Sequence, residues 1–147
     1  MATGAFDDVE RVPAQVAVSA VCVRRGRLLL VRRGRAPAAG TWALPGGRVQ
    51  PGETLRDAVA REVTEETSLT VDVLGLIGVT ERIGSDHHYV ICVHRVVADA
   101  REPVAGDDAD AVGWASSADL GALALVDRLR ADLEAWRIPA ELHEPTG

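Results

Sequence analysis

Three glutamates, Glu62, Glu65 and Glu66, lie in one stretch that the sequence predicts to be a helix. A helix turns about 100° per residue, so the three side chains fall within an arc of roughly 100°. The apolar residues Leu55, Ala58, Val59 and Val63 share that side, which faces the core. Clustered carboxylates repel one another and are costly to bury. A hard cation with oxygen ligands, Mg²⁺ or Mn²⁺, would relieve this conflict. The alternative is a solvated helix face with an Arg61–Glu65 ion pair.

Two turns precede this helix. Residues 44–47 include paired glycines, which allow the backbone to approach an ion or a phosphate closely. Residues 51–54 restart the chain as a helix, with Thr54 as the predicted N-cap. These turns favour the metal-binding interpretation over the solvated helix face.

The segment that contains the three glutamates resembles the Nudix box. That signature reads glycine, five residues, glutamate, seven residues, and then Arg-Glu-aliphatic-x-Glu-Glu-x-Gly-aliphatic. The chain is identified as a member of the Nudix hydrolase family, similar over about residues 15–137 to small ADP-ribose and deoxynucleotide pyrophosphohydrolases. The fixed positions are occupied by Gly47, Glu53, Arg61, Glu62, Val63, Glu65, Glu66 and Leu69.

Ser68 stands where the signature has its second glycine. A glycine at a helix end often takes the left-handed conformation. A serine adopts it at a cost of about 1 kcal/mol, so we expect altered helix-end geometry and an intact set of ligands.

The resemblance implies an α/β fold, a Nudix-type α/β/α sandwich with a mixed sheet, in one domain over residues 1–147. It implies hydrolysis of a nucleoside diphosphate linked to another moiety, with two or more Mg²⁺ ions, or Mn²⁺, as cofactors. The implied metal ligands are the three glutamates and the backbone carbonyl of Gly46. Glu53 and Arg61 are expected to orient the helix through an ion pair.

The resemblance also points to Asp108, six residues before Trp114, as a fourth metal ligand or the general base. Family members more often have glutamate there, so a direct contact by the shorter aspartate stays open. A box glutamate is the other candidate for the base. The structural alternative is a solvated acidic loop made of Glu102, Asp107, Asp108 and Asp110.

Candidate substrate contacts precede and follow the box. Arg32, Arg33 and Arg35 lead into the loop before Trp42 and could bind phosphates, and Arg33 resembles a phosphate-binding position in some relatives. Trp42 could stack on a base or belong to the core. One of His87 and His88 could face substrate, with a surface position as the alternative.

Composition limits the partners. A net charge of −6 argues against bulk attraction to nucleic acid or to an anionic membrane. The chain has no lysine, which excludes a Schiff-base or P-loop lysine. Its two cysteines form no metal-type spacing, and no apolar stretch is long enough to span a membrane, so we expect free thiols and a cytoplasmic location. The expected partner is a small nucleotide, and the resemblance also allows a homodimer.

Strand-like runs cover residues 16–23 and 27–31 as one hairpin, 71–83 and 89–97 as another, and a short segment around 112–114. Residues 32–41 and 101–110 are predicted loops. Residues 125–137 are predicted to form an amphipathic helix, with Ser116 or Ser117 capping a short helix before it. Residues 1–13 and the tail from 139 are predicted to be loose.

The substrate stays open at this stage. ADP-ribose or another nucleoside diphosphate sugar is the first candidate, because the acidic loop and spacing are similar to those of small relatives of that kind. The second is an oxidised or non-standard dNTP. Some enzymes of that kind read the purine with an asparagine, and this chain has none. Dinucleoside polyphosphates, and a non-catalytic nucleotide sensor on the same fold, complete the alternatives.

Overall fold

The computed structural model describes residues 11–36, 38–106 and 108–143. Residues 1–10 of the predicted loose leader (1–13), the end of the tail and Asp107 lie outside these residues. The first sheet has the strand order β5-β1-β7-β6. Its central strands, β1 (Gln15–Val21) and β7 (His88–Ala98), are parallel, and β5 (Gly46–Arg48) and β6 (Val71–Ile83) pair antiparallel at the two edges. The predicted mixed sheet is therefore confirmed.

A second, antiparallel sheet is built around β3 (Arg27–Arg33), which pairs with β2 (Val23–Arg24), β4 (Trp42–Ala43) and β8 (Ala109–Ala115). The sequence predicted a strand near 112–114 and a single hairpin of residues 16–23 with 27–31. The hairpin was wrong for most of its first strand: only β2 pairs with β3, whereas β1 belongs to the first sheet, between β5 and β7. The sequence also did not predict that β3 continues through Arg32 and Arg33. β8 pairs with β3 out to Arg33, across a register shift, and this long-range pairing keeps both arginines in the strand.

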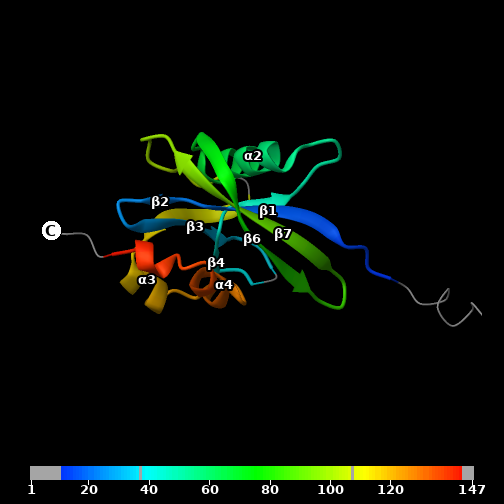
Figure 1. Cartoon of the computed structure of the whole chain (residues 1–147). Coiled ribbons are helices and arrows are strands. Elements are labelled where there is room, and N and C mark those ends of the chain that lie inside the picture. Colours follow the sequence, from blue (N-terminus) through cyan, green and yellow to red (C-terminus); the bar gives the residue numbers. More distant parts are fainter. Residues whose placement is uncertain (1–10, 37, 107, 144–147) are drawn as a thin grey trace, which may run out of the picture.

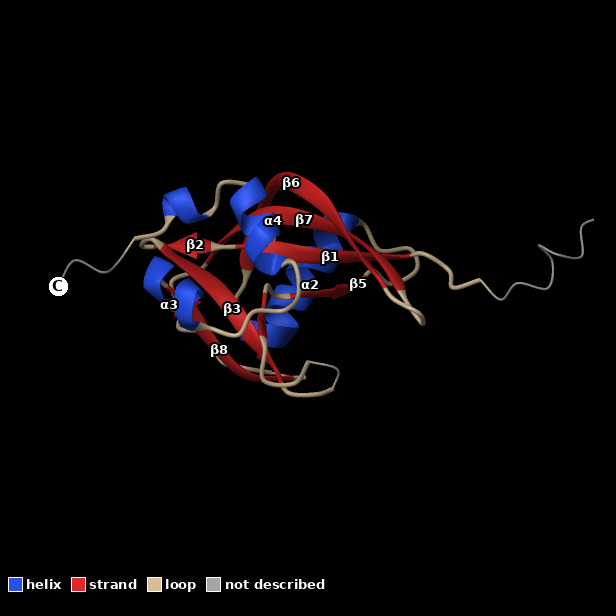
Figure 2. Cartoon of the chain, turned by 90° about the horizontal axis from the view of Figure 1, so that it is seen from below, coloured by secondary structure: helices blue, strands red, loops and turns tan. Residues whose placement is uncertain are grey.

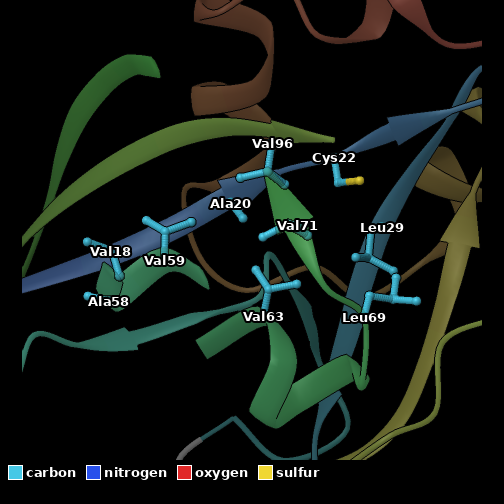
Figure 3. Close-up of a cluster of buried hydrophobic side chains, with 10 residues drawn as sticks. All are labelled: Val18, Ala20, Cys22, Leu29, Ala58, Val59, Val63, Leu69, Val71 and Val96. Atoms are coloured by element: carbon cyan, nitrogen blue, oxygen red, sulfur yellow. The ribbon is translucent and has the colours of Figure 1, made fainter. Parts of the chain in front are cut away.

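Helix α2 (Leu55–Thr67) begins as predicted, since the Thr54 hydroxyl accepts a hydrogen bond from the Asp57 N–H at 3.1 Å. Its apolar face packs on the first sheet, and Figure 3 shows Val59 and Val63 among the buried side chains of that layer. The prediction that Leu55 faces the core was wrong. Leu55 is 36% exposed because it lies in the first turn of the helix, at the edge of this contact.

Short helices cover the side of the two sheets that faces away from α2. They are α3 (Ser117–Ala122), α4 (Leu129–Ala135) and the 3-10 turn η1 (Pro139–Glu141). Figure 1 shows α2 on one side of the strands and α3 and α4 on the other, and Figure 2 views the second side from below. Two separate buried clusters, one for each face, confirm the α/β/α layering. No helix of the described residues is long and apolar enough to cross a membrane.

Two predictions for the C-terminal part were wrong. The final helix starts at Leu129 rather than at residue 125, because the preceding segment is held extended beside β4. The backbone N–H of Trp42 donates to the Ala124 carbonyl, and the Trp42 carbonyl accepts from the Val126 N–H. The tail from 139 is ordered as far as it is described, since Leu142 is only 8% exposed and packs in the second cluster.

Candidate active site

The three acidic residues of α2 lie beside β5, and the two glycines of β5 make this contact possible. A Cβ added to Gly47 would lie 2.5 Å from the carboxyl carbon of Glu62, so a side chain there would displace the Glu62 carboxylate. The Gly46 N–H points to Glu66, at 3.4 Å from Oε2. The sequence predicted that this turn approaches an ion or a phosphate. In the structure Gly46 and Gly47 belong to strand β5, which pairs with β1, rather than to a turn, and they lie against the carboxylates themselves.

Arg61 organises one side of the acid cluster. Its guanidinium binds both oxygens of Glu53, at 2.7 and 2.9 Å, and also reaches Glu62 at 2.8 Å and Glu65 at 3.2 Å. A further bond of 3.1 Å to the Arg48 carbonyl ties the helix to β5. The Arg61 bonds lower the pKa of Glu53 to about 2. The expected Glu53–Arg61 ion pair is present, and it also fixes Glu62.

Glu62 and Glu66 are the more buried carboxylates of the cluster, and burial next to like charge raises their pKa values. Burial, and then the charge of Glu62, raise the pKa of Glu66 to about 8, so Glu66 binds a proton at neutral pH in the metal-free protein. Burial also raises the pKa of Glu62, although Arg61 opposes that shift. Nearby Arg33 lowers the pKa of Glu66 slightly. The site therefore lacks positive charge, although one arginine is already bound to it.

These acids line a hollow of about 430 Å³. Asp108 contributes the wall opposite α2, although its side chain is 71% exposed. Arg35 also lines the hollow and pairs with Asp108 at 3.1 Å. The structure thus brings Asp108 and Arg35 to the acid cluster, while their roles as metal ligand or base and as phosphate contact stay predictions. The lining residues are Arg35, Glu62, Glu65, Glu66 and Asp108.

A second, larger hollow of about 840 Å³ shares Glu62 and Glu65 with the first. Its other walls come from the start of β1 and from the segment after β5, and they combine polar and apolar groups. Arg48 and Gln15 meet there across a long contact of 3.5 Å, and Val16 is 46% exposed. The sequence carries no local signal for this hollow, because only the long-range pairing of β1 with β5 brings the start of β1 next to the box. The added lining residues are Gln15, Val16, Arg48, Val49, Gln50, Pro51, Gly52, Glu53 and Arg61.

The remaining predicted contacts line neither hollow. Arg32 binds Asp110 at 2.6 Å and lies over the ring of Trp42, 5.7 Å from its centroid. Trp42 is half-buried and packs against the cluster on the α4 side, which agrees with the core alternative. His88 binds Glu81 at 2.8 Å in the β6–β7 hairpin, which agrees with its surface alternative.

The donor set fits a hard divalent cation. The three glutamates and Asp108 offer only oxygen ligands. Burial, and then the charge of Glu62, disfavour the ionised form of Glu66, and a cation bound beside Glu66 would favour it. In the described residues, no three His, Cys, Asp or Glu side chains converge tightly enough to form a ready-made metal-binding group. Glu62 is turned toward Arg61 instead, so these carboxylates would have to turn toward an ion.

Comparison with known proteins agrees with this geometry. The NUDIX domain family model matches residues 13–137, and the chain belongs to the Nudix family, whose members hydrolyse phosphoric anhydride bonds. A MutT NUDIX hydrolase structure from Burkholderia pseudomallei is 36% identical, has a TM-score of 0.76, and is matched over 83% of this chain and 97% of that one.

Two further relatives carry different names. An ADP-ribose pyrophosphatase of Methanocaldococcus jannaschii is 40% identical over 96 residues, which are 64% of this chain and 57% of that protein. A Mycobacterium tuberculosis protein, provisionally named 8-oxo-dGTP diphosphatase 2, is 39% identical over 111 residues, 72% of this chain and 76% of that one. This chain thus spans little more than half of the archaeal relative.

Proposed function

We propose that this protein hydrolyses a nucleoside diphosphate linked to a second sizeable moiety, with ADP-ribose as the first candidate. The supporting observation is the pair of hollows that share Glu62 and Glu65. A substrate whose scissile diphosphate lies at these acids has one group on each side. ADP-ribose would place a nucleoside in one hollow and a ribose in the other, whereas a dNTP has only a small pyrophosphate at one end.

Glu62, Glu65 and Glu66 would hold two or more Mg²⁺ ions, with the Gly46 carbonyl and Asp108 as further ligands. Bound there, the ions would neutralise the diphosphate and activate water for attack at phosphorus. Mn²⁺ could take the same oxygen ligands.

The other charged residues position these groups. Arg61, fixed by both oxygens of Glu53, holds Glu62 at the wall shared by the two hollows. Arg35 is mostly exposed and could exchange its ion pair with Asp108 for one with a substrate phosphate. Asp108 would then be available as a ligand or as the base that takes a proton from water.

An oxidised dNTP is the second candidate. The name of the mycobacterial relative favours it, and that relative is matched over the larger share of both chains. The absence of asparagine from the sequence counts against one known way of reading a damaged purine. A non-catalytic sensor is disfavoured, because every carboxylate of the box is present.

A substrate panel with Mg²⁺ tests the proposal. We expect AMP and ribose 5-phosphate from ADP-ribose, with a higher kcat/KM than for 8-oxo-dGTP or dGTP. The variant Arg48→Gln should raise KM for ADP-ribose and leave KM for 8-oxo-dGTP unchanged, with Arg130→Gln on α4 as the control. A higher kcat/KM for 8-oxo-dGTP would favour the second candidate. Nucleotide binding without turnover of any substrate would favour the sensor.

We also propose a cytoplasmic location and a homodimer. The free thiols of Cys22 and Cys92 support a reducing compartment. The edge strand β6 supports self-association, because it exposes large apolar side chains that water would otherwise cover. They are Leu74, Leu76, Val79 and Ile83. A monomeric mass in sedimentation analysis would reject the dimer.

A further inference from the structure

Ser68, the one residue that departs from the Nudix signature, makes a contact that glycine could not make. It ends α2 in the left-handed conformation, with φ 66°, and its N–H donates to the Thr64 carbonyl. Its hydroxyl donates to the carbonyl of Val104 at 3.1 Å. The residue that strains the helix end thus binds a loop 36 positions further along the chain.

The same loop caps the end of α2 through its backbone. The Val104 N–H donates to the Thr67 carbonyl at 2.8 Å, and the Gly106 N–H donates to the Glu66 carbonyl at 3.1 Å. These carbonyls belong to the last turn of α2, where the C=O groups have no N–H donor within the helix. A Cβ on Gly106 would lie 2.5 Å from the Glu65 carbonyl oxygen, so the loop lies closer to the helix than any other residue type allows.

This docked loop leads directly to Asp108. The Gly106 carbonyl accepts from the Ala109 N–H at 3.1 Å, and the Asp108 carbonyl accepts from the Gly34 N–H at 3.1 Å. The backbone around Asp108 is therefore held on one side by the end of α2 and on the other by Gly34, just after β3. Its place in the hollow depends on how firmly the loop is docked.

We propose that Ser68 is a positioning residue: its hydroxyl holds residues 104–106 on the end of α2 and thereby keeps Asp108 at the acid cluster. Ser68 lines neither hollow, so it acts through the loop and not on substrate. This inference rests on the proposed metal-binding role of Asp108.

The variant Ser68→Gly restores the family residue, removes the hydroxyl and relieves the left-handed strain. We expect its melting temperature to be equal to or higher than that of the wild type. The amides of Val104 and Gly106 should nevertheless exchange faster with deuterated water in the metal-free protein. Mn²⁺ affinity, measured by electron paramagnetic resonance, should fall about two- to tenfold, the range expected for one hydrogen bond. Ser85→Gly in the β6–β7 turn is the control.

Coupling to Asp108 separates positioning from a merely structural role. In an Asp108→Asn background, Ser68→Gly should cause no further loss of Mn²⁺ affinity. Gly106→Ala, which pushes the loop away from α2, should reproduce the loss in the wild-type background. Unchanged Mn²⁺ affinity in Ser68→Gly, or an equal loss with and without Asp108, would overturn the inference.

These measurements also distinguish the two proposals. If Ser68 and Asp108 are coupled in Mn²⁺ binding but no substrate is hydrolysed, the proposed function fails and the positioning role stands. If ADP-ribose is hydrolysed but the coupling is absent, the positioning role alone fails.

Discussion

At the scale of single residues, Glu66 has the most revealing environment. Its carboxyl group is enclosed between α2 and β5, next to Glu62 and within reach of the Gly46 N–H. Its pKa is raised to about 8 from an ordinary value of 4.5, mainly by burial. Ionising Glu66 therefore opposes folding, unless a cation is bound beside it.

This shift predicts how stability depends on pH. Between about pH 4.5 and 8 the folded metal-free protein binds more protons at Glu66 than the unfolded chain does, so stability falls as pH rises through this window and levels off above it. In Glu66→Gln this fall should be smaller, and the part that remains comes from Glu62, whose pKa is also raised by burial. Thermal melting in EDTA at pH 6, 7 and 8.5 measures both proteins. Parallel curves for the two would refute the assigned pKa.

Bound metal should reverse this trend, because an ion competes with the proton on Glu66. The rise in melting temperature caused by Mg²⁺ should therefore be larger at pH 8.5 than at pH 6. The same scans with and without Mg²⁺ measure it. An increase that is independent of pH would show that the ion does not bind at Glu66.

A further prediction at the scale of single residues concerns Asp108. Asp108→Asn keeps the size of the side chain but removes its charge, so kcat should fall about 10²–10³-fold, with a much smaller change in KM. Steady-state kinetics with ADP-ribose measure the two parameters. Asp110→Asn, in the neighbouring ion pair with Arg32, serves as a control. Near-normal turnover of Asp108→Asn would reject its role.

At the scale of elements, the site depends on how closely β5 approaches α2. Gly47 is the point of contact, since a Cβ there would lie 2.5 Å from the Glu62 carboxyl group. Arg61 strengthens the same contact by binding the Arg48 carbonyl of β5. The strand and the helix therefore fix the position of Glu62 together.

Gly47→Ala should displace Glu62 and reduce kcat by about 10²-fold, the cost of a misplacement of roughly 1 Å in a preorganised site. Overpacking should also destabilise the fold by about 1–3 kcal/mol. Gly113→Ala in β8 is the matched control, because a Cβ there meets nothing within 4 Å. Kinetics and thermal melting of both variants test the contact. Equal activity of the two variants would contradict it.

Local signals in the sequence identified the elements that carry the chemistry. Thr54 predicted the start of α2, and the run 71–83 matched β6, because a cap and an alternating strand depend on neighbouring residues. The late start of α4 could not be seen, since residue 125 is bridged to Trp42, far away in the sequence. The hollow beside Arg48 was missed for the same reason. Interactions between segments far apart in the sequence determine both the start of α4 and the hollow beside Arg48.

At the scale of the whole molecule, the two sheets and their helices contribute different parts of the site and of the core. The layer between α2 and the first sheet buries one apolar cluster and supports the helix that carries the acids, and the layer with α4 buries a separate apolar cluster. Figure 1 shows these layers on opposite sides of β1 and β7. Asp108 reaches the acids only because β8 of the second sheet returns beside β3. The complete site thus requires both sheets.

The most direct test of the central claim, that the α2 carboxylates bind the metal ions for anhydride hydrolysis, is a comparison of Glu65→Gln with the wild type. Glu65 is 42% exposed, so the substitution should leave the fold intact, and Glu134→Gln on α4 is the control. With Mg²⁺ and ADP-ribose, Glu65→Gln should release AMP at least about 10²-fold more slowly and bind Mn²⁺ more weakly. Wild-type turnover and Mn²⁺ affinity in Glu65→Gln would contradict the account.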